Sequence, residues 1–222
     1  MYQNIIFDFD GVIVDSNEIR IEGFRTLYAA ETGDRLDRFM QYVRGNRGLS
    51  RYRKIRYYYE QIRGEQAPNE LVERDARRYS QIVAKDVACA PELPGAEAFL
   101  AECKRDFRFA LVSASDQDEL RAICRLRGLD RYFDTILGSP EDKAVNIRNL
   151  MQNLGWHRRS TVYVGDSSND RTAADSVGID FIGFGKDNFQ VGERDHEVVD
   201  GFAQLRQMLL DRLNNQGALT RA

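Results

Sequence analysis

Four carboxylates in this chain of 222 residues lie where short apolar runs end. Asp8 and Asp10 end the first run, and Asp166 and Asp170 follow a later one. Asp8 also interrupts an apolar run, which costs free energy unless its charge is compensated. Carboxylates crowded into a dry cleft repel one another, and Mg²⁺ relieves that repulsion when it binds them together with phosphate oxygens. The pattern therefore predicts a site where carboxylates and Mg²⁺ act on a phosphate group.

A hydroxyl and an amine follow two further apolar runs. Ser113 and Ala114 end the run that starts at Phe107, and Lys143 opens a helix-length segment. A lysine ammonium can bind phosphate oxygens or restrain Asp8, and Ser113 with the N–H groups of a helix start can hold a phosphate oxygen. Each residue alone is more often a turn former, a cap or a solvated side chain. Together they suit phosphoryl transfer, whose catalysis is mainly positioning and neutralisation of charge.

The apolar runs themselves predict strands. Short runs bounded by turn residues are typical of a parallel sheet that is buried on both faces. The runs span residues 4–9, 107–113, 161–165 and 179–184, with a weaker one at 134–137. Helix-length segments alternate with them at residues 95–105, 117–127, 141–154, 168–177 and 202–213. The alternation predicts an α/β fold with a doubly wound, Rossmann-like parallel sheet, in which ligands bind beyond the carboxyl ends of the strands.

The stretch after the first predicted strand breaks this alternation. Residues 15–87 follow the i, i+3, i+4 spacing of amphipathic helices and contain no convincing strand. We therefore predict a helical cap domain at residues 15–87, inserted into an α/β core domain made of residues 1–14 and 88–222. The hinges between the two are expected near residues 15–16 and 90–95, where prolines and a glycine interrupt the pattern.

A basic stretch lies within the predicted cap, at residues 44–56. It contains six arginines and lysines, with glycines at two positions. We predict that Arg47 and Arg51 contact an anionic or hydroxyl-rich substrate, because arginine binds phosphates and carboxylates bidentately. A solvated basic helix face explains most of these charges equally well.

Composition excludes several classes of function. The formal net charge of -3 and the pI near 5.6 give no support to nucleic acid or a membrane surface as a partner. No apolar run approaches the ~20 residues of a membrane span, and the first apolar run is too short for a secretory signal. Three scattered cysteines predict free thiols in a reducing compartment. We therefore expect a cytoplasmic protein, and the sequence indicates no particular oligomeric state.

The candidate site residues resemble four motifs of the haloacid dehalogenase superfamily, in the same order. The first motif is similar to Asp8-Phe9-Asp10-Gly11-Val12-Ile13-Val14-Asp15-Ser16. Ser113 matches the second motif and Lys143 the third, and the fourth resembles residues 165–170 with Ala173-Ala174-Asp175 after them. The resemblance covers nearly the whole chain. Its helical insertion is similar to the small cap of the phosphoglycolate phosphatase and β-phosphoglucomutase-like branch.

The resemblance implies a role for each motif residue. Asp8 would be the nucleophile, and Asp10 the general acid and base. The resemblance implies Mg²⁺ bound by Asp8, by Asp10 through its backbone carbonyl, and by Asp166, with Asp170 binding directly or through water. Lys143 and Ser113, with Ala114 beside it, would hold the transferring phosphoryl group. Dehalogenases and phosphonoacetaldehyde hydrolases of this superfamily lack an acid two residues after the nucleophile. The acid at position 10 therefore argues against both activities.

These roles imply an Mg²⁺-dependent phosphatase that hydrolyses a small phosphate monoester through an aspartyl-phosphate intermediate. Its substrate would be a sugar, sugar-acid or glycolate-like phosphate. The alternative is a phosphomutase of the β-phosphoglucomutase type, which shares the motifs and the cap. A receiver-like signalling domain fits less well, because receivers carry no cap after the first strand and phosphorylate an aspartate on a later strand. A non-catalytic binding protein would be expected to lack a motif acid, and all are present.

Overall fold

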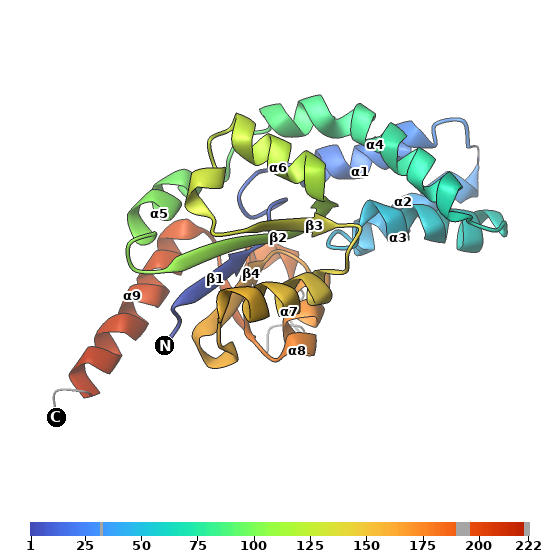
Figure 1. Cartoon of the computed structure of the whole chain (residues 1–222). Helices are drawn as coiled ribbons and strands as arrows, with labels where there is room; N and C mark the ends of the chain where they lie inside the picture. Colours follow the sequence, from blue (N-terminus) through green and yellow to red (C-terminus); the bar gives the residue numbers. More distant parts are fainter. Residues whose placement is uncertain (32, 190–195, 220–222) are drawn as a thin grey trace.

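One parallel sheet organises the chain (Figure 1). The computed structural model describes residues 1–31, 33–189 and 196–219, with side chains up to residue 212. Six strands follow the order β3-β2-β1-β4-β5-β6, and all neighbouring pairs are parallel. This confirms the predicted doubly wound α/β fold, with β6 as an additional strand that the apolar runs did not predict. The strands are β1 (Asn4–Phe7), β2 (Arg108–Asp116), β3 (Ile136–Ser139), β4 (Thr161–Gly165), β5 (Asp180–Phe184) and β6 (Glu197–Val199).

Helices cover both faces of the sheet, because successive side chains of a strand point to opposite faces. In β1, Ile5 and Phe7 join one buried cluster, whereas Ile6 joins another on the opposite face. The first cluster includes residues of α5 (Ala96–Cys103), α6 (Gln117–Leu126) and α9 (Phe202–Leu219). The second includes residues of α7 (Lys143–Leu154) and α8 (Ser168–Val177). Short 3₁₀ turns join these elements: η2 (Asp130–Tyr132), η3 (Arg158–Ser160) and η4 (Lys186–Asn188).

Three helices differ by two or more residues from the prediction, and the first of them, α5, ends at Cys103 and not at residue 105. α7 begins at Lys143 and not at residue 141, because the Asp142 carboxylate accepts a hydrogen bond from the Ala144 N–H at 3.1 Å and caps the helix there. Lys143 therefore occupies the first helical position, beside the carboxyl end of β3. At the other end of the chain, α9 continues to Leu219 and does not stop at residue 213.

A layer of helices lies beyond the carboxyl ends of the strands, at the right of Figure 1. It occupies the segment predicted as the cap, which we call the cap below. An aromatic cluster stabilises it: Phe24 packs edge-on against Phe39 with ring centroids 5.7 Å apart, and Tyr28 stacks on Tyr58 at 3.7 Å. Its elements are α1 (Asn17–Leu27), α2 (Asp34–Gly45), α3 (Arg51–Tyr57), the π-helix η1 (Tyr58–Arg63) and α4 (Asn69–Cys89).

The two segments that enter and leave the cap lie side by side. The Asp15 N–H donates to the Pro91 carbonyl at 2.9 Å, and the Leu93 N–H donates to the Ile13 carbonyl at the same distance. The paired segments coincide with the predicted hinges at residues 15–16 and 90–95. The boundary between cap and core remains a prediction, because α4 continues to Cys89, past the predicted end at residue 87.

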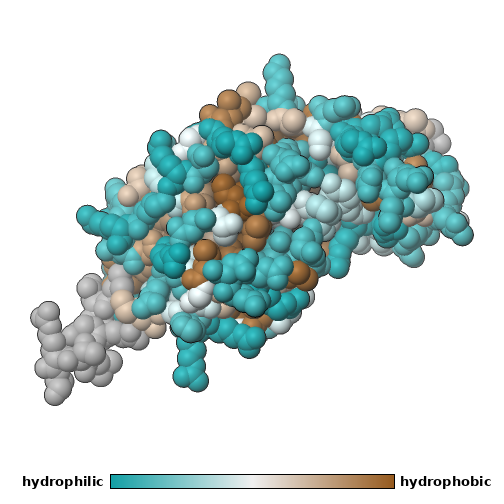
Figure 2. All heavy atoms as spheres, viewed as in Figure 1, coloured by the Kyte–Doolittle hydropathy of each residue, from teal (hydrophilic) through white to brown (hydrophobic). Residues whose placement is uncertain are grey.

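Polar and charged side chains cover most of the face seen in Figure 2, and hydrophobic residues form smaller areas near its middle. Among the residues whose side chains are described, only Met1 and Leu126 are large hydrophobic residues with substantial exposure, at 48% and 75%. In the described part of the chain, no helix combines the length and apolar character that crossing a membrane would require.

Candidate active site

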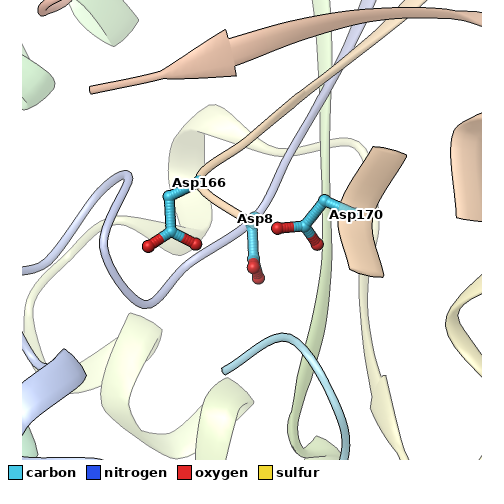
Figure 3. Close-up of side chains that lie close together, drawn as sticks. All are labelled: Asp8, Asp166 and Asp170. Carbon is cyan, nitrogen blue, oxygen red and sulfur yellow. The ribbon is translucent and has the colours of Figure 1, made fainter. Parts of the chain in front are cut away.

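Three of the predicted carboxylates meet at the carboxyl edge of the sheet, between β1 and β4. These two strands lie where the strand order reverses, which is where doubly wound sheets bind ligands. Asp8 follows β1, Asp166 follows β4, and Asp170 lies in the first turn of α8. Each offers a carboxylate oxygen, and these oxygens all lie within 4.8 Å of one another. Figure 3 shows Asp8 between the other two carboxylates.

Asp166 is held in place by the turn that follows β1. Gly11 adopts a φ of 77°, and a Cβ at this position would lie 2.3 Å from Oδ2 of Asp166. Only glycine allows this backbone conformation and this close approach. Asn17, at the start of α1, donates from Nδ2 to the same Oδ2 at 2.7 Å. A residue of the cap therefore orients a carboxylate of the core.

Burial and mutual repulsion make the three carboxylates difficult to ionise together. Burial raises the pKa of Asp8 well above its usual range, and Asp170 and Asp166 raise it further, against the opposing charge of Lys143. Burial, with the charge of Asp170, also raises the pKa of Asp166 to about 6, although Arg47 and Asn17 act in the other direction. Such a set requires positive charge.

Lys143 supplies one positive charge. Its Nζ donates to Oδ2 of Asp8 at 3.1 Å and also to Oδ1 of Asp170. Burial alone would lower the pKa of Lys143, but these two carboxylates raise it above its ordinary value. The ammonium stays charged next to Asp8, where it can bind a phosphoryl oxygen.

Asp170 serves both the helix and the carboxylate cluster. It forms a capping box with Ser167, whose N–H and hydroxyl donate to Oδ2 of Asp170 at 3.1 and 2.6 Å. Its other oxygen faces Lys143 and the Tyr163 hydroxyl, which lies 3.4 Å away. Asp170 therefore caps α8 with one oxygen and faces Lys143 with the other, and its role in metal binding stays a prediction.

The Asp10 carboxylate points away from the cluster of three. It accepts hydrogen bonds from Ser16 at 2.5 Å, from Ser115 at 2.6 Å and from Nε of Arg20 at 2.9 Å. Burial alone would raise the pKa of Asp10, but Arg20 and the two hydroxyl donors lower it below its ordinary value. The implied role of Asp10 in metal binding therefore concerns its backbone carbonyl and not this carboxylate.

Ser113 and Ala114 line the same site from β2. The side chain of Ser113 is buried, and its Oγ accepts a hydrogen bond from the Ser115 N–H at 3.1 Å. β2 extends to Asp116, three residues past the predicted end at Ser113. Ser113, Ala114 and Ser115 all line the cavity, and phosphate binding by the first two stays a prediction.

A small cavity of about 40 Å³ separates these core residues from the cap. That volume holds roughly three water molecules. The loop between α2 and α3 packs against the core beside this cavity: a Cβ at Gly48 would lie 2.3 Å from the Ser167 hydroxyl. Its walls are formed by Asp8, Asp10, Ser113, Ala114, Ser115 and Asp166 from the core and by Asn17, Arg20, Ile21, Phe24, Arg47, Gly48, Leu49, Arg51, Lys54 and Tyr79 from the cap.

Arg47 and Arg51 both line this cavity, but they differ in burial and in their hydrogen-bond partners. Arg47 is half-buried and donates to Oδ1 of Asn188 at 3.1 Å. Arg51 is buried and already paired, because its two terminal nitrogens donate to Glu119 at 2.8 and 3.0 Å. Arg51 also donates to the Ser80 hydroxyl. The prediction of substrate contact remains open for both residues, and Arg51 would make that contact with its charge already compensated.

Comparison with known proteins agrees with this geometry. A sequence model of the haloacid dehalogenase-like hydrolase family matches residues 5–184, from the first strand through β5. The chain belongs to this family. A phosphoglycolate phosphatase of Synechococcus elongatus is 27% identical over 185 residues, which span 80% of this chain and 81% of that protein. The predicted superfamily and the predicted hydrolase class are therefore confirmed.

Solved structures of the family share the fold. A predicted phosphatase from Clostridium acetobutylicum superposes with a TM-score of 0.77 at 19% identity and covers 95% of this chain and 99% of its own. A β-phosphoglucomutase from Clostridium difficile gives a TM-score of 0.75 at 19% identity, with coverage of 99% and 100%. At such identities the likeness concerns the arrangement of sheet and cap helices, and not the reaction.

Several residues of the site were not predicted from the sequence. Lys54 is buried at the cavity, and its Nζ donates to the Arg47 carbonyl at 3.1 Å. Arg20 and Glu119 form an ion pair between α1 and α6, 99 residues apart in the chain. Positions 51 and 54 lie three residues apart in α3 and therefore on one helix face, which was a usable signal for Lys54. No local pattern marked Arg20 or Glu119.

The carboxylate cluster fits a hard divalent cation. Asp8, Asp166 and Asp170 offer only oxygen atoms, which are the ligands that Mg²⁺ and similar cations prefer. Burial raises the pKa values of Asp8 and Asp166 even with Lys143 nearby, so added positive charge would favour their ionised forms. The donor set and the charge balance both support a divalent metal. Binding of Mg²⁺ in particular remains a prediction.

Proposed function

We propose that this family member is a phosphatase that transfers the phosphoryl group of a small phosphate monoester to Asp8 and then hydrolyses the aspartyl phosphate. The observation that carries the proposal is the position of Asp8, which lies buried beside Lys143 and two further carboxylates at the wall of the cavity between core and cap. A buried carboxylate with a lysine 3.1 Å away is suited to attack phosphorus once the charge of the site is neutralised.

In the first step, an oxygen of Asp8 forms a bond to phosphorus and the bond from phosphorus to the leaving oxygen breaks. Lys143 binds the phosphoryl oxygens, and Ser113 with the adjoining backbone N–H groups holds them from the other side. A divalent metal held by Asp8, Asp166 and Asp170 would supply further positive charge to the phosphoryl group. Asp10 donates its proton to the leaving oxygen, so the product departs as a neutral alcohol.

In the second step, water attacks phosphorus and the bond to Asp8 breaks. Asp10 accepts the proton of this water, which restores its protonated form, and inorganic phosphate leaves. Arg20 favours the carboxylate form of Asp10, which is the form that the second step requires. The first step requires the protonated form, so we expect its rate to depend on how firmly Arg20 holds this carboxylate.

The substrate proposed for this site is a small sugar, sugar-acid or glycolate-like phosphate. The cap supports recognition of the leaving group, because it contributes most of the cavity wall opposite the phosphoryl-binding residues. The partly open cavity of about 40 Å³ leaves little space between cap and core, so we expect the cap to move about its paired hinges when a substrate enters.

Phosphate release from a panel of phosphorylated metabolites, measured with and without Mg²⁺, tests the proposal. We expect release from at least one small monoester, dependent on the metal. Absence of release from every member of the panel would overturn the proposed function. Conversion of hexose 1-phosphate to 6-phosphate without release of phosphate would instead identify a mutase that uses the same Asp8 chemistry.

A further inference from the structure

A row of four charged side chains runs from Asp10 into the interface between core and cap. Nε of Arg20 donates to the Asp10 carboxylate at 2.9 Å, and Nη1 of Arg20 donates to Oε1 of Glu119. Arg51 donates to both oxygens of Glu119, at 2.8 and 3.0 Å, so Oε1 accepts from both arginines. We call Asp10, Arg20, Glu119 and Arg51 the Asp10–Arg51 row. Positive and negative charges alternate along it, so each arginine has a carboxylate partner.

The members of the row differ in their access to the cavity. The Asp10 side chain lines the cavity and is 15% exposed, as a residue that reaches a substrate must be. Glu119 does not line the cavity, and both of its oxygens are occupied by the two arginines. Glu119 therefore acts on a substrate only through Arg20, and never by contact.

Packing holds the far end of the row in place. The guanidinium of Arg51 lies 4.8 Å from the ring centroid of Tyr79, and it donates to the Ser80 hydroxyl. The Tyr79 hydroxyl donates to the backbone carbonyl of Arg20 at 2.7 Å. Burial alone would raise the pKa of Glu119, but Arg51 and Arg20 lower it to about 2. Arg20 is therefore anchored by a fixed carboxylate that is ionised throughout the physiological range.

This anchor limits how Arg20 binds Asp10. Nη1 is directed to Glu119, and Nη2 has no hydrogen-bond partner among the described residues, so Asp10 receives a single N–H, from Nε. Nε and Nη2 form one edge of the guanidinium, and such an edge favours a bidentate pair with a carboxylate. Without Glu119, Arg20 is free to turn this edge onto Asp10. A bidentate pair would draw the Asp10 carboxylate away from the leaving oxygen of a substrate.

We propose that Glu119 is a positioning residue for the general acid. It holds Nη1 of Arg20, so that Asp10 keeps a single bond to Arg20 and stays directed at the leaving oxygen, and Arg51 holds Glu119 in turn. This inference rests on the proposed phosphatase function, in which Asp10 gives its proton to the leaving oxygen. It predicts that loss of Glu119 harms a substrate more, the more its leaving group needs that proton.

Two phosphates of nearly equal size test the inference. Ethyl phosphate needs a proton on its leaving oxygen, whereas acetyl phosphate releases acetate, which leaves without one. The value of kcat/KM includes only the steps up to departure of the leaving group, so the ratio of kcat/KM for ethyl phosphate to that for acetyl phosphate measures the acid. Weaker phosphoryl binding or partial unfolding lowers both values together and leaves this ratio unchanged. Where ethyl phosphate is not hydrolysed, the best alcohol phosphate of the panel takes its place.

Glu119→Gln keeps the shape of the side chain and removes its charge. It should lower the ratio by about tenfold, which is part of the roughly 10²- to 10⁴-fold contribution of a general acid. The loss should be partial, because Ser16 and Ser115 still donate to Asp10. Asp10→Asn gives the ratio without the acid. Glu97→Gln is the matched control and should not change the ratio, because Glu97 forms an exposed ion pair with Arg131 at 2.7 Å, away from the cavity.

Glu119→Asp keeps a counter-charge for both arginines, so it tests the inference if the glutamine variant does not fold. Its carboxylate is withdrawn by one methylene, and the ratio should fall by at least about threefold, because small displacements of catalytic groups lower rates strongly. An unchanged ratio in folded Glu119→Gln, or in Glu119→Asp where the glutamine variant does not fold, would overturn the inference.

The inference and the proposed function fail in different ways. Absence of phosphate release from ethyl phosphate, acetyl phosphate and every member of the panel would contradict the phosphatase. A ratio that Asp10→Asn lowers but the folded position-119 variants leave unchanged would overturn only the role of Glu119. A ratio that Asp10→Asn itself leaves unchanged would contradict the acid role of Asp10, and the inference would fall with it.

Discussion

The two walls of the cavity handle charge in opposite ways. The core side gathers Asp8, Asp166 and Asp170, whose repulsion Lys143 and Arg47 offset in part, so added positive charge would stabilise it. The cap wall is rich in cations, but its charge is largely compensated, because Arg20 and Arg51 face Asp10 and Glu119.

This difference separates two tasks. An unbalanced wall attracts a metal ion and a phosphoryl group, because binding relieves its electrostatic strain. A balanced wall offers shape and directed hydrogen bonds without adding affinity for every anion. We therefore expect changes in the core to affect every substrate equally and changes in the cap to affect substrates according to their leaving groups.

The largest effect is expected from Asp8→Asn. Asparagine keeps the shape but cannot form the aspartyl phosphate, so kcat should fall by at least about 10⁴-fold on every substrate. Circular dichroism and thermal unfolding would establish that the variant folds. Asp134→Asn serves as the control, because Asp134 pairs with Arg108 at the amino end of β2 and should tolerate the change. A folded Asp8→Asn enzyme with a hundredth of the wild-type rate would contradict the covalent mechanism.

Removal of metal should have the next largest effect. EDTA should abolish phosphate release, and added Mg²⁺ should restore it, because the three clustered carboxylates otherwise repel an incoming phosphate dianion. Asp166→Asn should lower the affinity for Mg²⁺, measured by calorimetry, independently of turnover. Full activity in a sample verified to be free of metal would contradict the claim that the carboxylates of the core require a bound cation.

Cap variants should discriminate between substrates. Arg47→Ala should lower kcat/KM on a metabolite with a polar leaving group by about tenfold or more, and on p-nitrophenyl phosphate by much less. Arg51→Ala should add a loss of stability of about 3 kcal/mol, because it leaves the buried charge of Glu119 partly unpaired. Denaturant titration measures that loss. Equal losses of activity on both substrates would show that these arginines act in phosphoryl transfer and not in recognition of the leaving group.

The smallest effect is expected in the stability of a Lys54 variant. Burial, with Arg20 and Arg51, lowers the pKa of Lys54 from 10.5 to about 7, so the folded state releases a proton that the unfolded chain still holds between those values. The contribution of Lys54 to stability therefore rises with pH across this window and is least favourable below it. Lys54→Met should raise Tm by a few degrees near about pH 6, with a gain that shrinks towards about pH 10. A gain independent of pH would show that burial of this charge carries no cost.

The core wall could be predicted from the sequence, whereas most of the cap wall could not. Asp8 and Asp166 follow apolar runs of strand length, and a parallel sheet brings the ends of such strands to one edge. That inference needs only local patterns and the alternation of strands and helices. The same reasoning predicted Ser113 and Lys143 at this edge, where the structure has them.

The ion pairs of Arg20 and Arg51 with Glu119 form only because the cap is docked on the core. Arg20 and Glu119 are charged residues on amphipathic helices, where a solvated position is the ordinary interpretation. Their contact spans 99 residues and follows from the position of the cap, whose helix α4 packs against α6. The orientation of the Asp10 carboxylate follows from the same docking, because Arg20 holds it. Helical spacing indicates which residues share a face, but the docking geometry determines whether that face is buried.

Trapping of the phosphorylated enzyme tests the central claim most directly. Enzyme quenched during turnover and treated with borohydride should contain homoserine in place of one aspartate, because the reagent reduces an acyl phosphate. Mass spectrometry of the digested protein should locate that change at Asp8, at a level that follows the substrate concentration. Homoserine at Asp166 or Asp170, or its absence from an enzyme that is releasing phosphate under the same conditions, would contradict the account.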